Sequence, residues 1–555
     1  MRRPSLNEFL LLSAAIFFAL LLAGCSSSST STTVPGPPNP NPNPGPDPAP
    51  SSVDVLTYHY DNLRSGENLQ ETILTPANVN SSKFGKLGEL LVDGKVDAQP
   101  LYLSNVSIPG VGARNVLYVV TEHGTVFAFD ADNVSASAPP FWKITTQSPG
   151  EGPSDDRGCY QVTPEIGITA TPVIDRTRGA IYVVAVSKDA AGNYFHRIHA
   201  LDLATGKELF GGPTTITASF PGTGAGSTGG TVVFDPREYN ERPGLLEING
   251  TVYTTWGSHC DAGPYSSWVI SYSADTLKQT SVLNLAPNGS AGGIWMSGAA
   301  PAADPAGNIY FLIGNGTFDT ALNASGFPSR GDCGNCFAKI SSAAPVKLLD
   351  YFTPLNTVAE SAADEDLGSG GPLLLPDLTD ASGTTRHLAV GSGKDAIIFV
   401  LDRDNMGKFN ATQNNIYQQI STQLAGGEFA KPSYFNGTVY YGAVGDNLKA
   451  FPIVNAKLAI APSSQSSAQF PFPGVTPSIS ANGAMNGIVW AVENTAPAVL
   501  HAYDAASLAT ELYNSSQASS GRDNFAGNKF ITAMIANGKV FVGTPASVAV
   551  FGPLQ

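Results

Sequence analysis

Short runs of apolar residues recur along almost the whole chain, whereas the spacing typical of amphipathic helices is rare. Three of the clearest runs follow an Asn-Gly pair: 249–257 (NGTVYTTWG), 436–445 (NGTVYYGAVG) and 537–546 (NGKVFVGTPA). Asn-Gly favours a tight turn, and the residues after it are β-branched or aromatic, so each run predicts a hairpin. The pattern therefore predicts an all-β protein.

These hairpins belong to a longer repeat: a small residue, a proline, an apolar pair, a turn, and two strands of which the second ends in Ala-aromatic-Asp. Its prolines lie 45 to 72 residues apart, at Pro100, Pro172, Pro243, Pro301, Pro372, Pro432 and Pro477. An eighth copy, residues 530–551, lacks the proline. A repeat of this size, with about four strands, is typical of propeller blades. We expect a single β-propeller of eight four-stranded blades, with seven as the alternative. Strands near 55–60 or 86–92 would complete the last blade.

The first 52 residues differ in composition from the rest. Arg2 and Arg3 precede an apolar run from 9 to 22, as in a secretory signal. The stretch LLAGC resembles the lipobox of bacterial lipoproteins, which implies a signal peptide over 1–24 and a lipid on Cys25. Residues 25–52 are rich in Ser, Pro and Asn and are expected to be an extended tether. The propeller then occupies 53–555, exported and lipid-anchored at the cell envelope.

Charge and cysteine content narrow the range of functions. The formal net charge of −15 argues against binding nucleic acid or an anionic lipid surface. Cys333 and Cys336 lack the histidine of a c-type haem site, so a local disulfide is expected there. An enzyme without haem would need a separate electron acceptor.

From about 97 to 405 the chain resembles the quinoprotein alcohol dehydrogenases, eight-bladed propellers that bind pyrroloquinoline quinone (PQQ) and calcium on their axis. It resembles more closely the bacterial lipoproteins described as PQQ-like propellers. The segment 292–316 (GGIWMSGAAPAADPAGNIYFLIGNG) matches the family's cofactor floor at Trp295 and a calcium ligand at Asn315. The segment 391–405 matches its quinone-contacting lysine at Lys394.

The resemblance also implies roles for three aspartates. Asp364 or Asp366, in 363–377 (ADEDLGSGGPLLLPD), is expected to be the general base that takes the hydroxyl proton of an alcohol or sugar. Asp261 is the only carboxylate near the position of the family's calcium-binding glutamate. Calcium takes carboxylate and amide oxygens and would polarise the quinone carbonyl, while Trp295 would stack beneath the ring.

Two departures from the family keep other functions open. The family's pair of adjacent cysteines is reduced here to Cys159, and no glutamate lies in 258–268. Cys159 and Cys260 occupy equivalent regions of consecutive repeats, so a disulfide between them is expected.

One hypothesis is a PQQ- and calcium-dependent dehydrogenase of alcohols or sugars, or a degenerate relative. The alternative is a non-catalytic surface propeller that binds carbohydrate or protein, or a scaffold for envelope assembly. In that case Asn315 is a turn residue, Trp295 fills the channel, Lys394 is solvated, and 364–366 is an exposed acidic loop.

Overall fold

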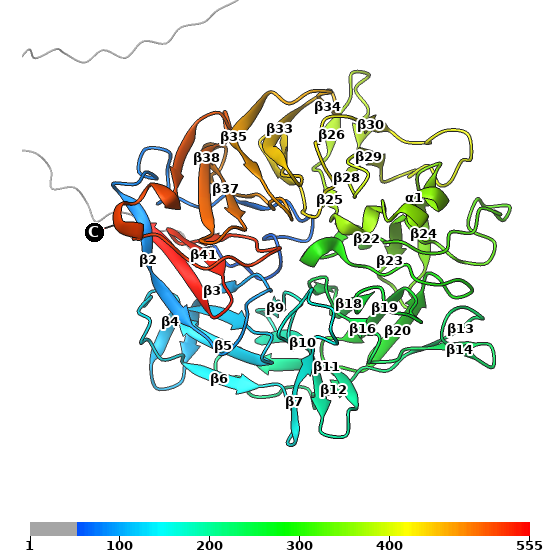
Figure 1. The fold of residues 1–555 in the computed structure, drawn as a ribbon, viewed down its shortest axis with the longest axis horizontal. Coiled ribbons are helices and arrows are strands. Elements are labelled where there is room, and N and C mark those ends of the chain that lie inside the picture. The colour runs from blue at the N-terminus through cyan, green and yellow to red at the C-terminus, as the bar shows by residue number, and fades with distance from the viewer. Residues whose placement is uncertain (1–52, 555) are drawn as a thin grey trace, which may run out of the picture. The chain divides into compact units, whose positions relative to one another are not determined.

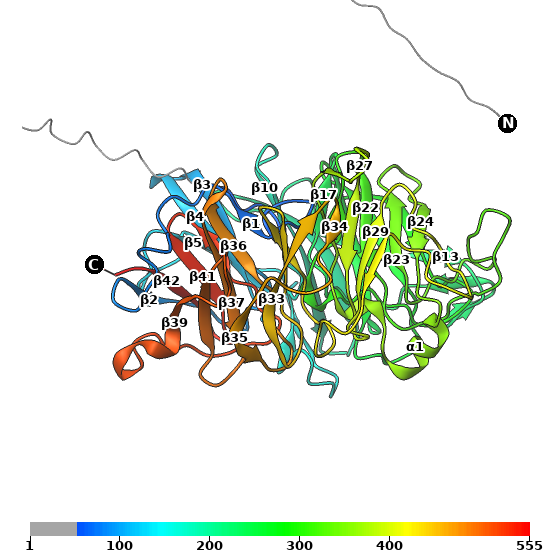
Figure 2. The same ribbon diagram turned by 90° about the horizontal axis from the view of Figure 1, so that it is seen from above.

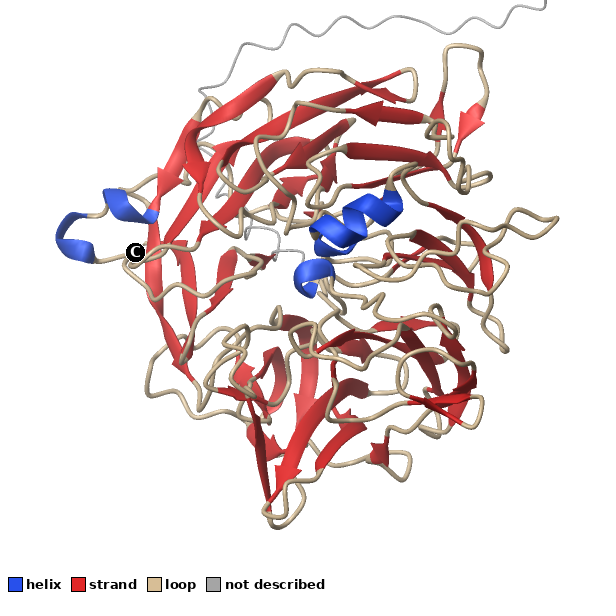
Figure 3. Ribbon diagram, turned by 45° about the vertical axis from the view of Figure 1, so that its right-hand side comes forward, coloured by secondary structure: helices blue, strands red, loops and turns tan. Residues whose placement is uncertain are grey.

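Residues 53–554, which the computed structural model describes, form a β-propeller in which successive sheets are arranged around one centre (Figure 1). Strands dominate, and the one α-helix in this range is α1 (Thr357–Ala363) (Figure 3). The all-β propeller predicted from the sequence is therefore confirmed. The expected signal peptide, the tether and the lipid on Cys25 lie outside the described residues. No helix within 53–554 is long and apolar enough to cross a membrane.

Eight sheets in this range have four or more strands, the number expected for eight blades. The first sheet contains β3 (Leu101–Ile108), β4 (Gly112–Val120), β5 (Thr125–Asp130) and β6 (Trp142–Thr145). The second contains β7 (Glu151–Asp155), β8 (Glu165–Ile166), β9 (Val173–Asp175), β10 (Ala180–Asp189), β11 (Tyr194–Asp202) and β12 (Thr214–Thr215). The third contains β16 (Tyr239–Asn240), β17 (Leu246–Ile248), β18 (Thr251–Ser258), β19 (Trp268–Ser273) and β20 (Gln279–Asn284). The fourth contains β21 (Ala302–Ala303), β22 (Asn308–Leu312), β23 (Phe337–Ser341) and β24 (Leu348–Phe352).

The other four sheets continue around the ring. The fifth contains β25 (Leu373–Leu374), β28 (Leu388–Gly391), β29 (Ile398–Asp402) and β30 (Gln418–Ile420). The sixth contains β31 (Ser433–Phe435), β32 (Thr438–Tyr441), β33 (Asp446–Val454), β34 (Lys457–Leu458) and β35 (Ser464–Phe470). The seventh contains β1 (Glu67–Asn68), β36 (Ser478–Asn482), β37 (Met485–Glu493), β38 (Val499–Asp504) and β39 (Glu511–Asn514). The eighth contains β2 (Phe84–Leu91), β40 (Met534–Ala536), β41 (Lys539–Gly543) and β42 (Ser547–Pro553).

Smaller elements lie outside the eight large sheets. β13 (Ser219–Pro221), β14 (Ser227–Thr228) and β15 (Thr231–Val233) form a three-stranded sheet, and β26 (Leu378–Thr379) pairs with β27 (Thr385–Arg386). The 3-10 helices are η1 (Met296–Gly298), η2 (Leu367–Ser369), η3 (Ser515–Gln517) and η4 (Ser519–Gly521). Seen from the side, α1 lies on one face of the ring (Figure 2).

The ring closes by pairing the beginning of the described chain with its end. β2 runs antiparallel to β42, from Phe84 opposite Pro553 to Leu91 opposite Ser547. Of the two strands suggested by the sequence, the one near 86–92 therefore completes the last sheet. The strand pairing that closes the ring involves only residues within 84–553. A protein that begins at residue 53 therefore retains it.

The repeat prolines have one structural role. Each lies shortly before the innermost strand of a sheet, as Pro100 does before β3 and Pro372 before β25. A proline lacks the N–H that a strand interior needs, so it is tolerated at a strand's start. The repeat therefore marks where the chain leaves the centre of the ring.

Residues 55–68 run along the centre and are not a strand of the last blade, so that alternative was wrong. Val55 pairs with Tyr102, and the carbonyl oxygens of Leu56, Leu63, Ser65 and Gly66 accept the N–H groups of Ile174, Leu374, Tyr434 and Ile479 in turn. These partners lie on the innermost strands, whose free edges would otherwise leave backbone groups unpaired. Arg64, fully buried, donates to the carbonyls of Tyr58, Asp61 and Pro301 and fixes this segment.

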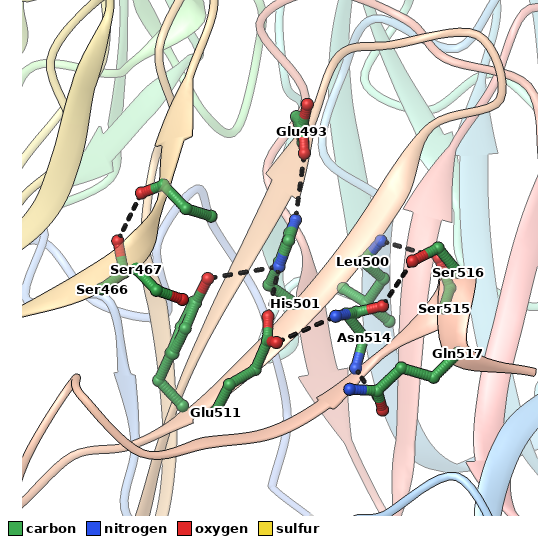
Figure 4. Close-up of polar contacts among 12 residues, drawn as sticks. Ser466, Ser467, Glu493, Leu500, His501, Glu511, Asn514, Ser515, Ser516 and Gln517 are labelled. Atoms are coloured by element: carbon green, nitrogen blue, oxygen red, sulfur yellow. Dashed lines mark hydrogen bonds and ion pairs between the residues drawn. The ribbon is translucent and has the colours of Figure 1, made fainter.

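A buried histidine stabilises the seventh sheet (Figure 4). His501 on β38 places Nδ1 2.7 Å from Glu511 and Nε2 3.2 Å from Glu493. Burial by itself would lower the pKa of His501, but the contacts with Glu493 and Glu511 outweigh burial and raise it. The two carboxylates therefore favour the imidazolium form of His501.

We expect His501→Gln to lower the free energy of unfolding by on the order of 1–2 kcal/mol at pH 6 and by less at pH 9. A group whose pKa is raised on folding stabilises the fold fully below its unfolded pKa. That stabilisation is lost as the pH rises through its folded pKa. Thermal unfolding at both pH values measures the difference. His387→Gln is the control, because that ring is 39% exposed beside Asp404. Equal losses at both pH values for His501→Gln would contradict the charge cluster.

Candidate functional site

A pocket of about 140 Å³ lies at the centre of the ring, because loops spread from Gln161 to Phe530 line it together. Five of the six residues predicted to bind a cofactor or a metal or to act as base line this pocket: Asp261, Trp295, Asn315, Asp366 and Lys394. The sixth, Asp364, accepts hydrogen bonds from Asn315 and Lys394. The structure thus brings together residues up to 133 positions apart in the sequence.

Trp295 lies against glycine backbone. A Cβ atom on Gly257, Gly293 or Gly314 would lie 2.8 Å from the indole, at Cε3, Nε1 and Cδ1 respectively. Real Cβ atoms do not approach so closely, so each of these positions needs glycine if the ring is to stay where it is. The Gly-Asn-Gly sequence after β22 therefore supports the tryptophan as well as turning the chain.

Lys394 lies at the centre of a network of polar contacts. Its ammonium is bonded to Oδ1 of Asp364 and lies 2.9 Å from Oδ1 of Asp366. The amide Nδ2 of Asn315 donates to Asp364 Oδ1 at 2.5 Å. Asn315 follows β22, Asp364 and Asp366 follow α1, and Lys394 follows β28, so only the closed ring assembles the network.

The two candidate aspartates differ in environment. The side chain of Asp364 is 68% exposed, whereas that of Asp366 is 3% exposed. Burial raises the pKa of Asp366, and Lys394 only partly opposes this. For Lys394 burial lowers the pKa, but Asp366 and Asp364 together outweigh burial and raise it. Asp366 is therefore the better candidate for a base.

The oxygen atoms suited to a metal ion are few. Asn315 Oδ1 is buried without a hydrogen-bond partner, as expected for an oxygen that would bind a cation or a ligand donor. However, the ammonium of Lys394 already pairs with both Asp364 and Asp366, and Asp261 Oδ1 accepts the hydroxyl of Tyr265 at 2.7 Å. Calcium takes six to eight oxygens, so a bound ligand would have to supply most of them.

The sequence did not reveal a second group of pocket residues, which is basic and aromatic. Arg242 and Lys529 lie over the ring of Phe530, at 4.8 and 5.6 Å from its centroid. Within 53–554 neither cation makes a hydrogen bond or an ion pair through its side chain. Burial, with Arg242 and Lys95 nearby, lowers the pKa of Lys529. This wall of the pocket is therefore positive and unpaired.

The repeat proline is a sequence signal that could have pointed to Arg242, although not to Lys529 or Phe530, which precede no repeat proline. Arg242 lies one residue before Pro243, and the pocket residues Ser369 and Phe429 lie three residues before Pro372 and Pro432. The chain reaches the centre of the ring just before each of these prolines, so the preceding residues face the axis.

Both expected disulfides are present. Cys333 and Cys336 are joined with a Cα–Cα distance of 5.7 Å, and Cys159 and Cys260 with a distance of 6.0 Å. The second bond links two loops from neighbouring sheets that also carry the pocket residues Gln161 and Asp261. It therefore fixes one side of the pocket.

No protein-family model matches the sequence, and no curated protein matches it. Solved structures do match the fold. The quinohemoprotein alcohol dehydrogenase of Comamonas testosteroni has a TM-score of 0.59 at 14% identity, over 90% of this chain and 80% of that one. A quinohemoprotein alcohol dehydrogenase of Pseudomonas putida has 0.57 at 13%, over 90% and 80%. A europium-containing methanol dehydrogenase has 0.56 at 11%, over 90% and 98%. At these identities the similarity establishes the fold: residues 53–554 form a β-propeller like those of the quinoprotein alcohol dehydrogenases.

Proposed function

We propose that the central pocket binds a planar, anionic quinone of the PQQ type and that the protein oxidises an alcohol or a sugar. The observation that carries this is the meeting of Trp295, Asn315, Asp366 and Lys394 in one pocket with two unpaired cations. The names of the proteins with similar folds, alcohol and methanol dehydrogenases, support the same reading. Secretion and the lipid on Cys25 belong to the proposal as well.

The pocket residues fit such a ligand in both shape and charge. PQQ is a flat ring system with three carboxylates, and the pocket offers the indole of Trp295 and three cations, Arg242, Lys394 and Lys529. Stacking on an aromatic ring and charge-assisted hydrogen bonds are the interactions that a flat anion needs. Asn315 Oδ1 would contribute to binding calcium, with Asp261 nearby.

In this proposal the chain positions the substrate and moves a proton. The bound quinone would supply the hydride acceptor, which no side chain here supplies. Asp366 would accept the substrate hydroxyl proton, because its raised pKa brings a carboxylate closer to the pH at which it must work. Lys394 would hold Asp366 in place, and Phe429, Phe472 and Phe530 would exclude water. A separate acceptor would take the electrons onward.

One observation favours the non-catalytic alternative. The ammonium of Lys394 lies between Asp364 and Asp366, where a cation could otherwise bind, and the protein oxygens free for calcium are few. The same pocket would then hold an anionic aromatic or carbohydrate ligand without turnover. Protein binding and envelope scaffolding are the other members of this class.

A calorimetric titration of the chain from residue 53 with PQQ, with and without calcium, tests the proposal. We expect one site with a dissociation constant of about 10 μM or lower. Turnover of alcohols or sugars with an artificial electron acceptor would then distinguish the enzyme from a binding protein. Absence of binding at tens of micromolar would rule out the quinone reading and leave the alternative.

A further inference from the structure

A cluster of two cysteines and a histidine lies beside the central pocket. We propose that Cys159, His259 and Cys260 bind one zinc ion when the disulfide between the two cysteines is reduced. The ligand atoms of these residues all lie within 4.8 Å of one another. Two thiolates and an imidazole are a common donor set for zinc.

The loops place these ligands without large rearrangement. Cys159 follows β7, whereas His259 and Cys260 follow β18, and the two cysteine Cα atoms are 6.0 Å apart across 101 residues of sequence. Zinc–sulfur and zinc–nitrogen bonds of about 2.0–2.3 Å place tetrahedral ligands about 3.3–3.8 Å apart. The present separation of the ligand atoms, within 4.8 Å, is close to that spacing.

One ring nitrogen of His259 is left free to bind a metal. Its Nε2 lies 2.6 Å from the carbonyl oxygen of Asp156, so Nε2–H donates there and Nδ1 keeps its lone pair. Metal-binding histidines commonly use their other ring nitrogen in this way, which fixes the tautomer. The Asp156 side chain is in turn held by Gly158 N–H and Thr163.

The same side chains therefore have two covalent states. A dithiol or phosphine reductant supplies two electrons, the S–S bond breaks, and two protons complete the two thiols. Binding of Zn²⁺ then releases those two protons, because the thiolate is the ligand. Three protein ligands leave one coordination position for water.

This site is close enough to affect the central pocket. A small cavity lined by His259, Cys260, Arg242 and Trp295 lies between the two. The zinc and the disulfide would both link the two loops, so this side of the pocket would be held together in either state. The inference stands independently of the quinone proposal, because its readout is metal content.

The test uses the chain from residue 53, reduced and then freed of reductant under anaerobic conditions. We expect about one equivalent of zinc in the reduced protein and none in the oxidised protein, measured by elemental analysis. Cobalt as a substitute should give a thiolate-to-cobalt charge-transfer band. His259→Ala should weaken zinc binding at least about tenfold while keeping both cysteines, and Cys159→Ser should abolish the band.

Two outcomes would overturn the inference. One is a reduced protein that binds no stoichiometric zinc. The other is zinc binding that His259→Ala and Cys159→Ser leave unchanged but that Cys333→Ser with Cys336→Ser removes, which would place the metal on the second cysteine pair. That double variant should otherwise retain the zinc and the band.

Discussion

Replacing Trp295 by alanine is expected to weaken binding of PQQ on the order of a hundredfold. The indole is the largest flat surface lining the central pocket, and three glycines hold it in place. A buried aromatic side chain that stacks on a ligand contributes through both area and ring geometry. Calorimetric titration of wild type and variant measures the change directly, without relying on tryptophan fluorescence.

Two further variants separate a stacking role from a general loss of structure. In Gly257→Ala the three atoms nearest the new Cβ would all belong to Trp295, at 2.8 to 3.1 Å, so the ring must shift although the tryptophan is retained. We expect this variant also to bind PQQ more weakly. Trp142→Phe changes a tryptophan outside the pocket and should bind as wild type does. Full affinity in both Trp295→Ala and Gly257→Ala would show that the ligand lies elsewhere.

The second large effect concerns stability. Glu428→Gln is expected to raise the free energy of unfolding by on the order of 3 kcal/mol at pH 7 and to have little effect near pH 4.5. Glu428 is fully buried, and neither carboxylate oxygen has a hydrogen-bond partner. Burial raises the pKa of Glu428 to about 8.

The raised pKa of Glu428 determines how the stability difference changes with pH. Since the folded pKa lies above the unfolded one, wild type is most stable relative to the variant at low pH and loses stability as the pH rises towards 8. Glutamine keeps the shape and cannot ionise. Thermal unfolding between pH 4.5 and 8.5 measures the difference, and Glu365→Gln, at an exposed position, should change stability by less than about 0.5 kcal/mol. A Glu428→Gln effect that does not vary with pH would contradict a buried, titrating carboxyl.

Local sequence determined the blades. Each Asn-Gly turn and the β-branched residues after it predict a hairpin from a few neighbouring positions, and the structure pairs β31 with β32 and β40 with β41 as expected. The repeat prolines determined where inner strands begin, because a proline is excluded from a strand's interior. Closure by the strand near 86–92 was one of two options, and only pairing with β42 selected it.

Tertiary structure decided the site. Whether Asp364 or Asp366 is buried depends on where α1 ends against the ring, and the short acidic run contains no pattern that distinguishes them. Arg242 and Lys529 meet on Phe530 because the ring brings together loops from both halves of the chain, and no spacing in sequence encodes that contact. The path of residues 55–68 along the axis was likewise beyond local pattern, since its hydrogen bonds go to strands far along the sequence. Sequence thus determined the elements, which depend on near neighbours, and the closed ring decided the pocket, which depends on contacts between distant residues.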